Sequence, residues 1–146
     1  MNLTEKINND IKTAMLSKDK ESLEGLRAIK AGLLLMKTSG NDLTDEMELQ
    51  MLQKLVKQRK ESAEIYTSAG KQELADVELS QARVIEKYLP KQLSHDELCL
   101  GIEQIIKDVN ATTIRDMGKV MGVASKMFAG KADGKTISTI VKSLLN

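Results

Sequence analysis

Apolar residues recur at helical spacing along almost the whole chain, and this periodicity limits the possible folds more than any other feature. Leu3, Ile7 and Ile11 begin the first series, and Ile140 and Leu144 close the last one. Steps of three and four residues place side chains on one face of a helix. The chain has only one Phe, two Tyr and no Trp, whereas sheets favour aromatic and β-branched residues. The sequence therefore predicts an all-α protein.

Capping residues, glycines and a single proline divide this periodicity into seven predicted helices. They span about residues 3–17, 20–38, 45–69, 71–89, 95–109, 114–129 and 134–145. Gly40 and Gly70 are suited to the left-handed conformation that ends a helix. Pro90 stops the fourth helix because it lacks an amide hydrogen. The Ser94–Glu97 pair forms a capping box that starts the next helix.

This division predicts two domains. Residues 1–92 form a four-helix part in which the third and fourth helices make a long antiparallel hairpin around Gly70. Residues 93–146 form a three-helix unit whose apolar stripes can cover one another.

Two charged residues, Arg59 and Glu78, interrupt the apolar stripes of the hairpin. Antiparallel pairing around Gly70 places residue 59 near 81 and residue 62 near 78, so Arg59 is expected to reach Glu78 with Gln81 close by. A buried charge without a partner costs several kcal/mol, whereas a paired one can fix helix register. The pattern predicts a structural ion pair in preference to an anion site.

The composition excludes several classes of function. No apolar run approaches the roughly 18 residues of a membrane span, and charges throughout residues 1–20 argue against a secretory signal. The expected location is therefore cytoplasmic. One Cys and one His cannot supply a disulfide or a zinc site. The sequence contains no phosphate-binding glycine loop, nucleophile elbow or evident acid–base pair. We predict no catalytic residue, no metal and no cofactor.

The sixth predicted helix separates a basic face from an apolar one. Arg115, Lys119, Gly122 and Lys126 follow one another at steps of four, three and four residues. The opposite stripe consists of Met117, Val120, Met121, Ala124 and Phe128. Residues 110–146 carry six basic and two acidic groups, a net charge of +4. Such a bias is compatible with a polyanionic partner, although solvated surface lysines are the commoner explanation.

Gly118 and Gly122 give this basic face a backbone notch. Each glycine costs about 1 kcal/mol of helix stability relative to alanine, so either another helix packs closely there or an external ligand approaches. If a ligand binds there, the sugar-phosphate edge of RNA fits this surface better than a base-reading site would, because aromatic side chains for stacking are nearly absent. The candidate nucleic-acid-binding residues are Arg115, Gly118, Lys119, Gly122, Lys126, Lys131 and Lys135.

Four motifs, in this order, resemble the YqeY family. They are Val56-Lys-Gln-Arg-Lys-Glu-Ser62, Tyr88-Leu-Pro-Lys-Gln-Leu93, Asp116-Met-Gly-Lys-Val-Met-Gly122 and Gly130-Lys-Ala-Asp-Gly-Lys135. The C-terminal part of that family is similar to the tail domain of the B subunit of the glutamine-dependent aspartyl/glutamyl-tRNA amidotransferase. The resemblance covers essentially the whole chain and implies a two-part, all-helical fold.

The resemblance also implies contact with tRNA, because the amidotransferase tail is thought to touch it. Carbon–nitrogen ligase activity with glutamine as amido donor belongs to that enzyme's other domains and subunits, so family association suggests at most an accessory role beside a protein of the transamidation pathway. Two interpretations remain open. One is a non-catalytic tRNA-binding module, and the other is a helical protein-interaction adaptor that binds no nucleic acid. The oligomeric state is not predicted.

Overall fold

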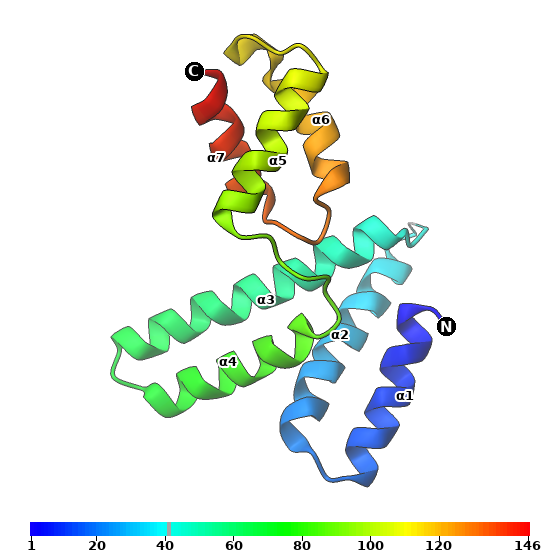
Figure 1. Cartoon of the computed structure of the whole chain (residues 1–146). Helices are drawn as coiled ribbons and strands as arrows, with labels where there is room; N and C mark the ends of the chain where they lie inside the picture. Colours follow the sequence, from blue (N-terminus) through cyan, green and yellow to red (C-terminus); the bar gives the residue numbers. More distant parts are fainter. Residues whose placement is uncertain (41) are drawn as a thin grey trace. The chain divides into compact units, whose positions relative to one another are not determined.

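The computed structural model describes residues 1–40 and 42–146, and these residues form an all-helical structure without β-strands (Figure 1). The α-helices are α1 (Leu3–Leu16), α2 (Lys20–Thr38), α3 (Asp45–Ser68), α4 (Gln72–Glu86), α5 (His95–Asp108), α6 (Met117–Met127) and α7 (Gly134–Leu145). A short 3-10 turn, η1 (Ile114–Asp116), precedes α6. The predicted all-α class is confirmed. The fourth helix ends at Glu86, three residues earlier than predicted, and η1 replaces the first turn of the predicted sixth helix.

The predicted capping box and the predicted helix-ending glycines are found at the expected residues. The backbone amide of Glu97 donates to Ser94 Oγ at 3.1 Å, and the amide of Ser94 donates to Glu97 Oε1 at 3.2 Å. These reciprocal bonds form the predicted capping box and lower the pKa of the Glu97 carboxyl. Gly40 and Gly70 have φ values of +83° and +74°, a conformation that glycine adopts without steric cost.

The chain divides into two compact units, which we call unit 1 (Met1–Leu89) and unit 2 (Pro90–Asn146). The division falls at Pro90, whereas the sequence prediction placed the boundary between residues 92 and 93. Each unit has its own set of buried apolar side chains.

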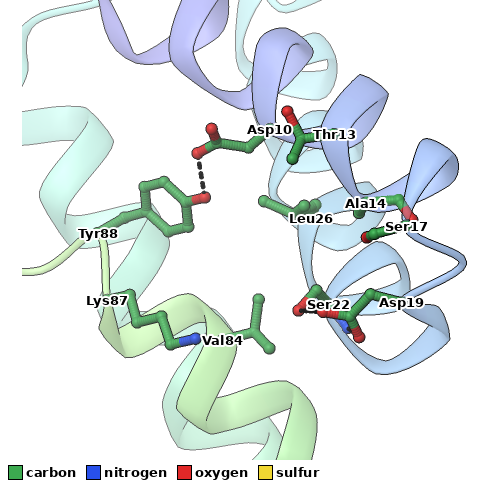
Figure 2. A pocket seen from close by; sticks show the side chains of 10 residues that line it. All are labelled: Asp10, Thr13, Ala14, Ser17, Asp19, Ser22, Leu26, Val84, Lys87 and Tyr88. Atoms are coloured by element: carbon green, nitrogen blue, oxygen red, sulfur yellow. Dashed lines mark hydrogen bonds between the residues drawn. The ribbon is translucent and has the colours of Figure 1, made fainter.

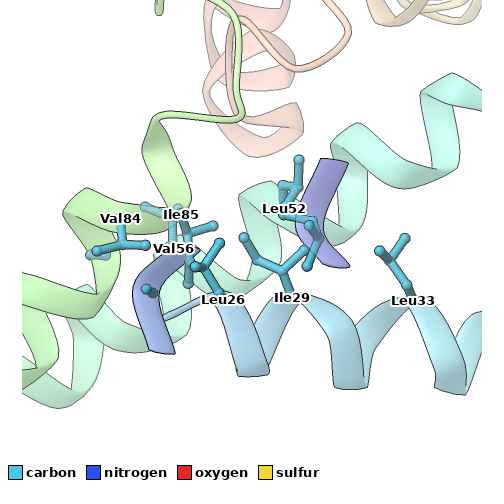
Figure 3. Packing of buried hydrophobic residues seen from close by; sticks show 10 residues of the cluster. Leu26, Ile29, Leu33, Leu52, Val56, Val84 and Ile85 are labelled. Carbon is cyan, nitrogen blue, oxygen red and sulfur yellow. The ribbon is translucent and has the colours of Figure 1, made fainter. Parts of the chain in front are cut away.

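Unit 1 is built on the α3–α4 hairpin, with α2 packed against α4 and α1 packed against α2 (Figure 1). Its core lies between these four helices (Figure 3). The buried side chains that Figure 3 labels are Leu26, Ile29, Leu33, Leu52, Val56, Val84 and Ile85.

Helices α2 and α4 approach closely at Gly25, which is buried. A Cβ atom at Gly25 would lie 2.7 Å from Val84 Cγ1 and 3.4 Å from the backbone oxygen of Gln81. A side chain at this position would therefore force the two helices apart. Gly25 costs helix stability, but it permits this contact.

The predicted ion pair between Arg59 and Glu78 does not form. Both side chains are half-buried, but Arg59 Nε donates to Gln81 Oε1 at 3.2 Å and a guanidinium nitrogen donates to the carbonyl of Leu55 at 3.3 Å. No ion pair joins Arg59 to Glu78 in the described part of the chain, where α3 and α4 are instead linked by Lys60 Nζ and Glu86 Oε1 at 3.0 Å. The hairpin register places Gln81 opposite Arg59, while Glu78 lies about one turn nearer the hairpin tip.

Unit 2 is a three-helix arrangement of α5, α6 and α7 around a core of its own. Its buried side chains are Leu98, Ile102, Ile105, Val120, Ala124, Phe128, Ile137, Ile140, Val141 and Leu145. Here too a glycine allows close packing, because a Cβ atom at Gly101 would lie 2.6 Å from Phe128 Cζ.

Candidate nucleic-acid interface

Helix α6 has the two faces that its sequence predicts. Val120 and Ala124 are completely buried in the core of unit 2. Lys119, Gly122 and Lys126 are exposed on the other side of the same helix. The side of α6 that faces solvent therefore carries two ammonium groups and a bare stretch of backbone.

The two glycines of this face, Gly118 and Gly122, have no close neighbour. A Cβ atom built at either position meets no atom within 4 Å outside the helix's own backbone and the adjoining residues. Packing by another helix of unit 2, which is one of the two explanations for these glycines, is thus not found in the described residues. Within unit 2 the notch is open to a partner.

Arg115 is exposed, but it lies in η1 rather than in α6. A 3-10 turn advances by three residues per turn instead of 3.6, so the four-residue step from Arg115 to Lys119 no longer guarantees a shared face. Asp116 stabilises the turn. Its carboxylate oxygen Oδ2 accepts hydrogen bonds from the backbone amides of Thr112 at 2.9 Å and Thr113 at 3.2 Å. These two hydrogen bonds lower the pKa of Asp116.

The segment that follows Pro90 holds the loop after α6 in place through two hydrogen bonds. Gln92 Nε2 donates to the carbonyl oxygen of Gly130 at 2.6 Å, and the amide of Leu93 donates to the carbonyl of Lys131 at 2.9 Å. Gly130 is buried with a φ of +74°, while the Lys131 side chain is exposed. Two of the motifs that resemble the YqeY family therefore meet in space. No sequence pattern indicates this role of Gln92, since helical periodicity carries no information on contacts between loops.

Lys135 lies in the first turn of α7 and is exposed. The backbone amide of Lys135 donates to Asp133 Oδ1 at 3.0 Å, so Asp133 caps this helix as predicted. The cap places a negative charge at a helix end that would otherwise attract an anion. The basic character of the region thus depends on lysine side chains rather than on the amino end of α7.

The described residues offer few alternatives for chemistry. No group of three or more His, Cys, Asp or Glu side chains among them is arranged to hold a metal ion. Cys99 is half-buried, and its Sγ lies 3.6 Å from His95 Nδ1 on the first turn of α5. Within the described chain, no helix combines the length and hydropathy that crossing a membrane would require.

Comparison with known proteins identifies the family. A family model described as Yqey-like protein matches residues 4–145. The chain belongs to the YqeY family. This match confirms the family that the four sequence motifs indicated, and it spans both units of this YqeY protein.

Two curated relatives are fungal proteins named "Altered inheritance of mitochondria protein 41, mitochondrial". The protein from Pyrenophora tritici-repentis is 26% identical over 140 residues, which cover 93% of this chain and 77% of the relative. The protein from Meyerozyma guilliermondii is 31% identical over 83 residues, which cover 57% of this chain and 44% of the relative. The aligned part is thus less than half of the second relative.

These relatives correct one sequence-based expectation. The cytoplasmic location is wrong by this comparison, since both names point to mitochondria instead. The expectation depended on the charged residues near the start of the chain. Such residues argue against a secretory signal only and do not distinguish the remaining compartments.

Proposed function

We propose that this YqeY protein is a non-catalytic tRNA-binding module whose ligand surface is the exposed face of α6 with the loop that follows it. The observation that supports this most strongly is the open notch at Gly118 and Gly122, next to the exposed ammonium groups of Lys119 and Lys126. A phosphate backbone can approach a helix closely where Cβ atoms are missing, and lysines beside it can neutralise the phosphates.

Charge and loop geometry add support. Residues 110–146 carry a net charge of +4, which favours association with a polyanion. The anchored carbonyls of Gly130 and Lys131 hold the backbone from which the Lys131 side chain projects. The resemblance to the amidotransferase tail supplies the choice of tRNA as the RNA, and it suggests that the protein acts as an accessory to transamidation.

The test is a binding titration of the full chain with fluorescently labelled tRNA at several salt concentrations. Each phosphate contact contributes about 0.7–0.9 to the slope of log K against log salt. The double variant Lys119→Gln/Lys126→Gln should bind more weakly and lose about two contacts from this slope. Extending it with Arg115→Gln measures whether η1 adds a third contact.

A matched control separates this face from overall charge. Lys107→Gln/Lys142→Gln removes two exposed lysines from α5 and α7 of the same unit, and it should leave both affinity and slope nearly unchanged. Equal losses in the two double variants would show non-specific attraction and overturn the assignment of α6. No measurable tRNA binding by the parent protein would favour the adaptor interpretation.

Gly122→Ala tests the close approach of the backbone separately from charge. The added methyl group should weaken tRNA binding while helix content is kept, because nothing inside unit 2 obstructs it. Undiminished binding by this variant would exclude contact at the notch.

A further inference from the structure

Unit 1 contains a cavity between α1, α2 and the end of α4. None of the residues that line it belongs to α6. Figure 2 shows the side chains that line it. Its volume is about 180 Å³, below the roughly 300–1,000 Å³ of sites for drug-sized ligands. The buried side chains of Leu26 and Val84 contribute apolar walls. Asp10, Asp19 and Lys87 contribute two carboxylates and one ammonium group.

Close packing at Gly25 brings the end of α4 to this position. Because Gly25 has no side chain, Val84 can lie against α2, and Lys87 and Tyr88 follow Val84 in the chain. The Tyr88 hydroxyl donates to Asp10 Oδ2, which joins the end of α4 to α1 (Figure 2). Burial and this hydrogen bond raise the pKa of Tyr88, so the phenol remains the donor.

The charged groups of the cavity differ in the partners that they have. Both carboxylate oxygens of Asp19 already accept hydrogen bonds, one from the backbone amide of Ser22 at 3.2 Å and one from the Ser22 hydroxyl at 2.6 Å. Asp10 Oδ1 accepts no hydrogen bond from the described residues, because its bond from Tyr88 uses the other oxygen. The Lys87 side chain is exposed, and its Nζ forms no ion pair or hydrogen bond in the described chain. The hydrogen bonds from Ser22 and, to a smaller extent, the charge of Lys87 lower the pKa of Asp19, but neither carboxylate of the cavity contacts Lys87 directly.

We propose that this cavity binds a small zwitterion, with its ammonium group on Asp10 and its carboxylate on Lys87. In Figure 2 these two side chains enter the cavity from different sides, Asp10 from α1 and Lys87 from the end of α4. A simple anion would meet two carboxylates, and a simple amine would leave Lys87 unpaired and be repelled by it. A molecule with both charges satisfies both groups, and the apolar walls accommodate a short carbon chain.

Calorimetric titration of the full chain with ω-amino acids tests the proposal. Glycine, β-alanine, 4-aminobutyrate, 5-aminopentanoate and 6-aminohexanoate separate the two charges by increasing lengths, so one length should bind best. Butylamine and butyrate, each carrying one of the charges, should bind at least about tenfold more weakly than the best zwitterion. Equal binding of butylamine, or no binding of any amino acid at millimolar concentration, would overturn the proposal.

Variants of the two contact residues locate the bound molecule. Asp10→Asn keeps an oxygen that can accept the Tyr88 hydrogen bond but removes the charge, and Lys87→Met keeps an unbranched side chain. Each should weaken binding of the best amino acid by about tenfold or more. Lys71→Met is the matched control, since Lys71 is an exposed residue at the opposite end of α4. Binding that survives both site variants, or that is lost equally in the Lys71 control, would exclude this cavity.

Discussion

Gly25 and Gly122 are both glycines within α-helices, but their surroundings differ. The missing side chain of Gly25 is replaced by Val84 from α4, and a Cβ atom there would collide with it. At Gly122 the same test meets empty space. Glycine lowers helix stability by about 1 kcal/mol in both places, and only the first is compensated by packing within its own unit. The comparison shows why a glycine pattern alone cannot distinguish a packing contact from a surface open to a partner.

The largest effect on stability is expected from a substitution that breaks the contact between α2 and α4 at Gly25. Gly25→Leu should destabilise unit 1 by roughly 3 kcal/mol, because it overpacks a site with no free space. Both tyrosines of the chain, Tyr66 and Tyr88, lie in unit 1, so urea unfolding followed by tyrosine fluorescence reports on this unit. Val84→Ala in the same chain should recover part of the loss by making room. A Gly25→Leu protein as stable as the parent would contradict the close approach of α2 and α4.

Gly122→Ala should raise stability, whereas Gly25→Leu lowers it. With no neighbour within 4 Å, the substitution should stabilise α6 by about 1 kcal/mol. Gly118→Ala should give less, since Gly118 is the second residue of the helix. Slower amide hydrogen exchange in α6 measures the change locally, which matters because two units need not unfold together. Faster exchange after Gly122→Ala would mean that the position is packed after all.

The smallest expected effect concerns the start of α6 and depends on pH. The folded-state pKa of Asp116 is lowered by the amides of Thr112 and Thr113. The stabilisation from its carboxylate is therefore complete above the unfolded pKa, about 3.9, and is lost as pH falls through the folded value. Carboxyl NMR should show Asp116 titrating below that value. Asp116→Asn should remove this part of the acid sensitivity of η1, and an unchanged profile would rule out the cap.

Much of the fold was predictable because it depends on local signals. The helix breaks at Gly40, Gly70, Pro90 and Ser94 follow from backbone conformation and capping, which act within a few residues. The amphipathic character of α6 followed from periodicity in the same way. Arg59 was different. Pairing around Gly70 placed it opposite Gln81, as observed, but the prediction preferred the opposite charge of Glu78, which lies one turn away, to the amide oxygen directly opposite.

The remaining features depend on contacts between distant segments. Nothing in the spacing of Asp10 and Tyr88 indicates that they meet, and Gln92 gives no local sign of its bond to Gly130. The glycine notch was predicted as a pattern, but only coordinates could show that Gly118 and Gly122 lack an internal neighbour. The assignment of the basic face to tRNA remains a proposal.

The bond between Asp10 and Tyr88 also has a consequence for the order of events during synthesis. It joins residues 78 positions apart. At roughly 5–20 residues per second, Tyr88 is made about 4–16 s after Asp10. From the synthesis of Thr38 until α4 is made, α1 and α2 exist without α4, and Leu26 and Ile29 lack part of the surface that later buries them. The apolar face of α2 therefore stays partly exposed on the nascent chain until residue 88 is available, and unit 1 can close only then.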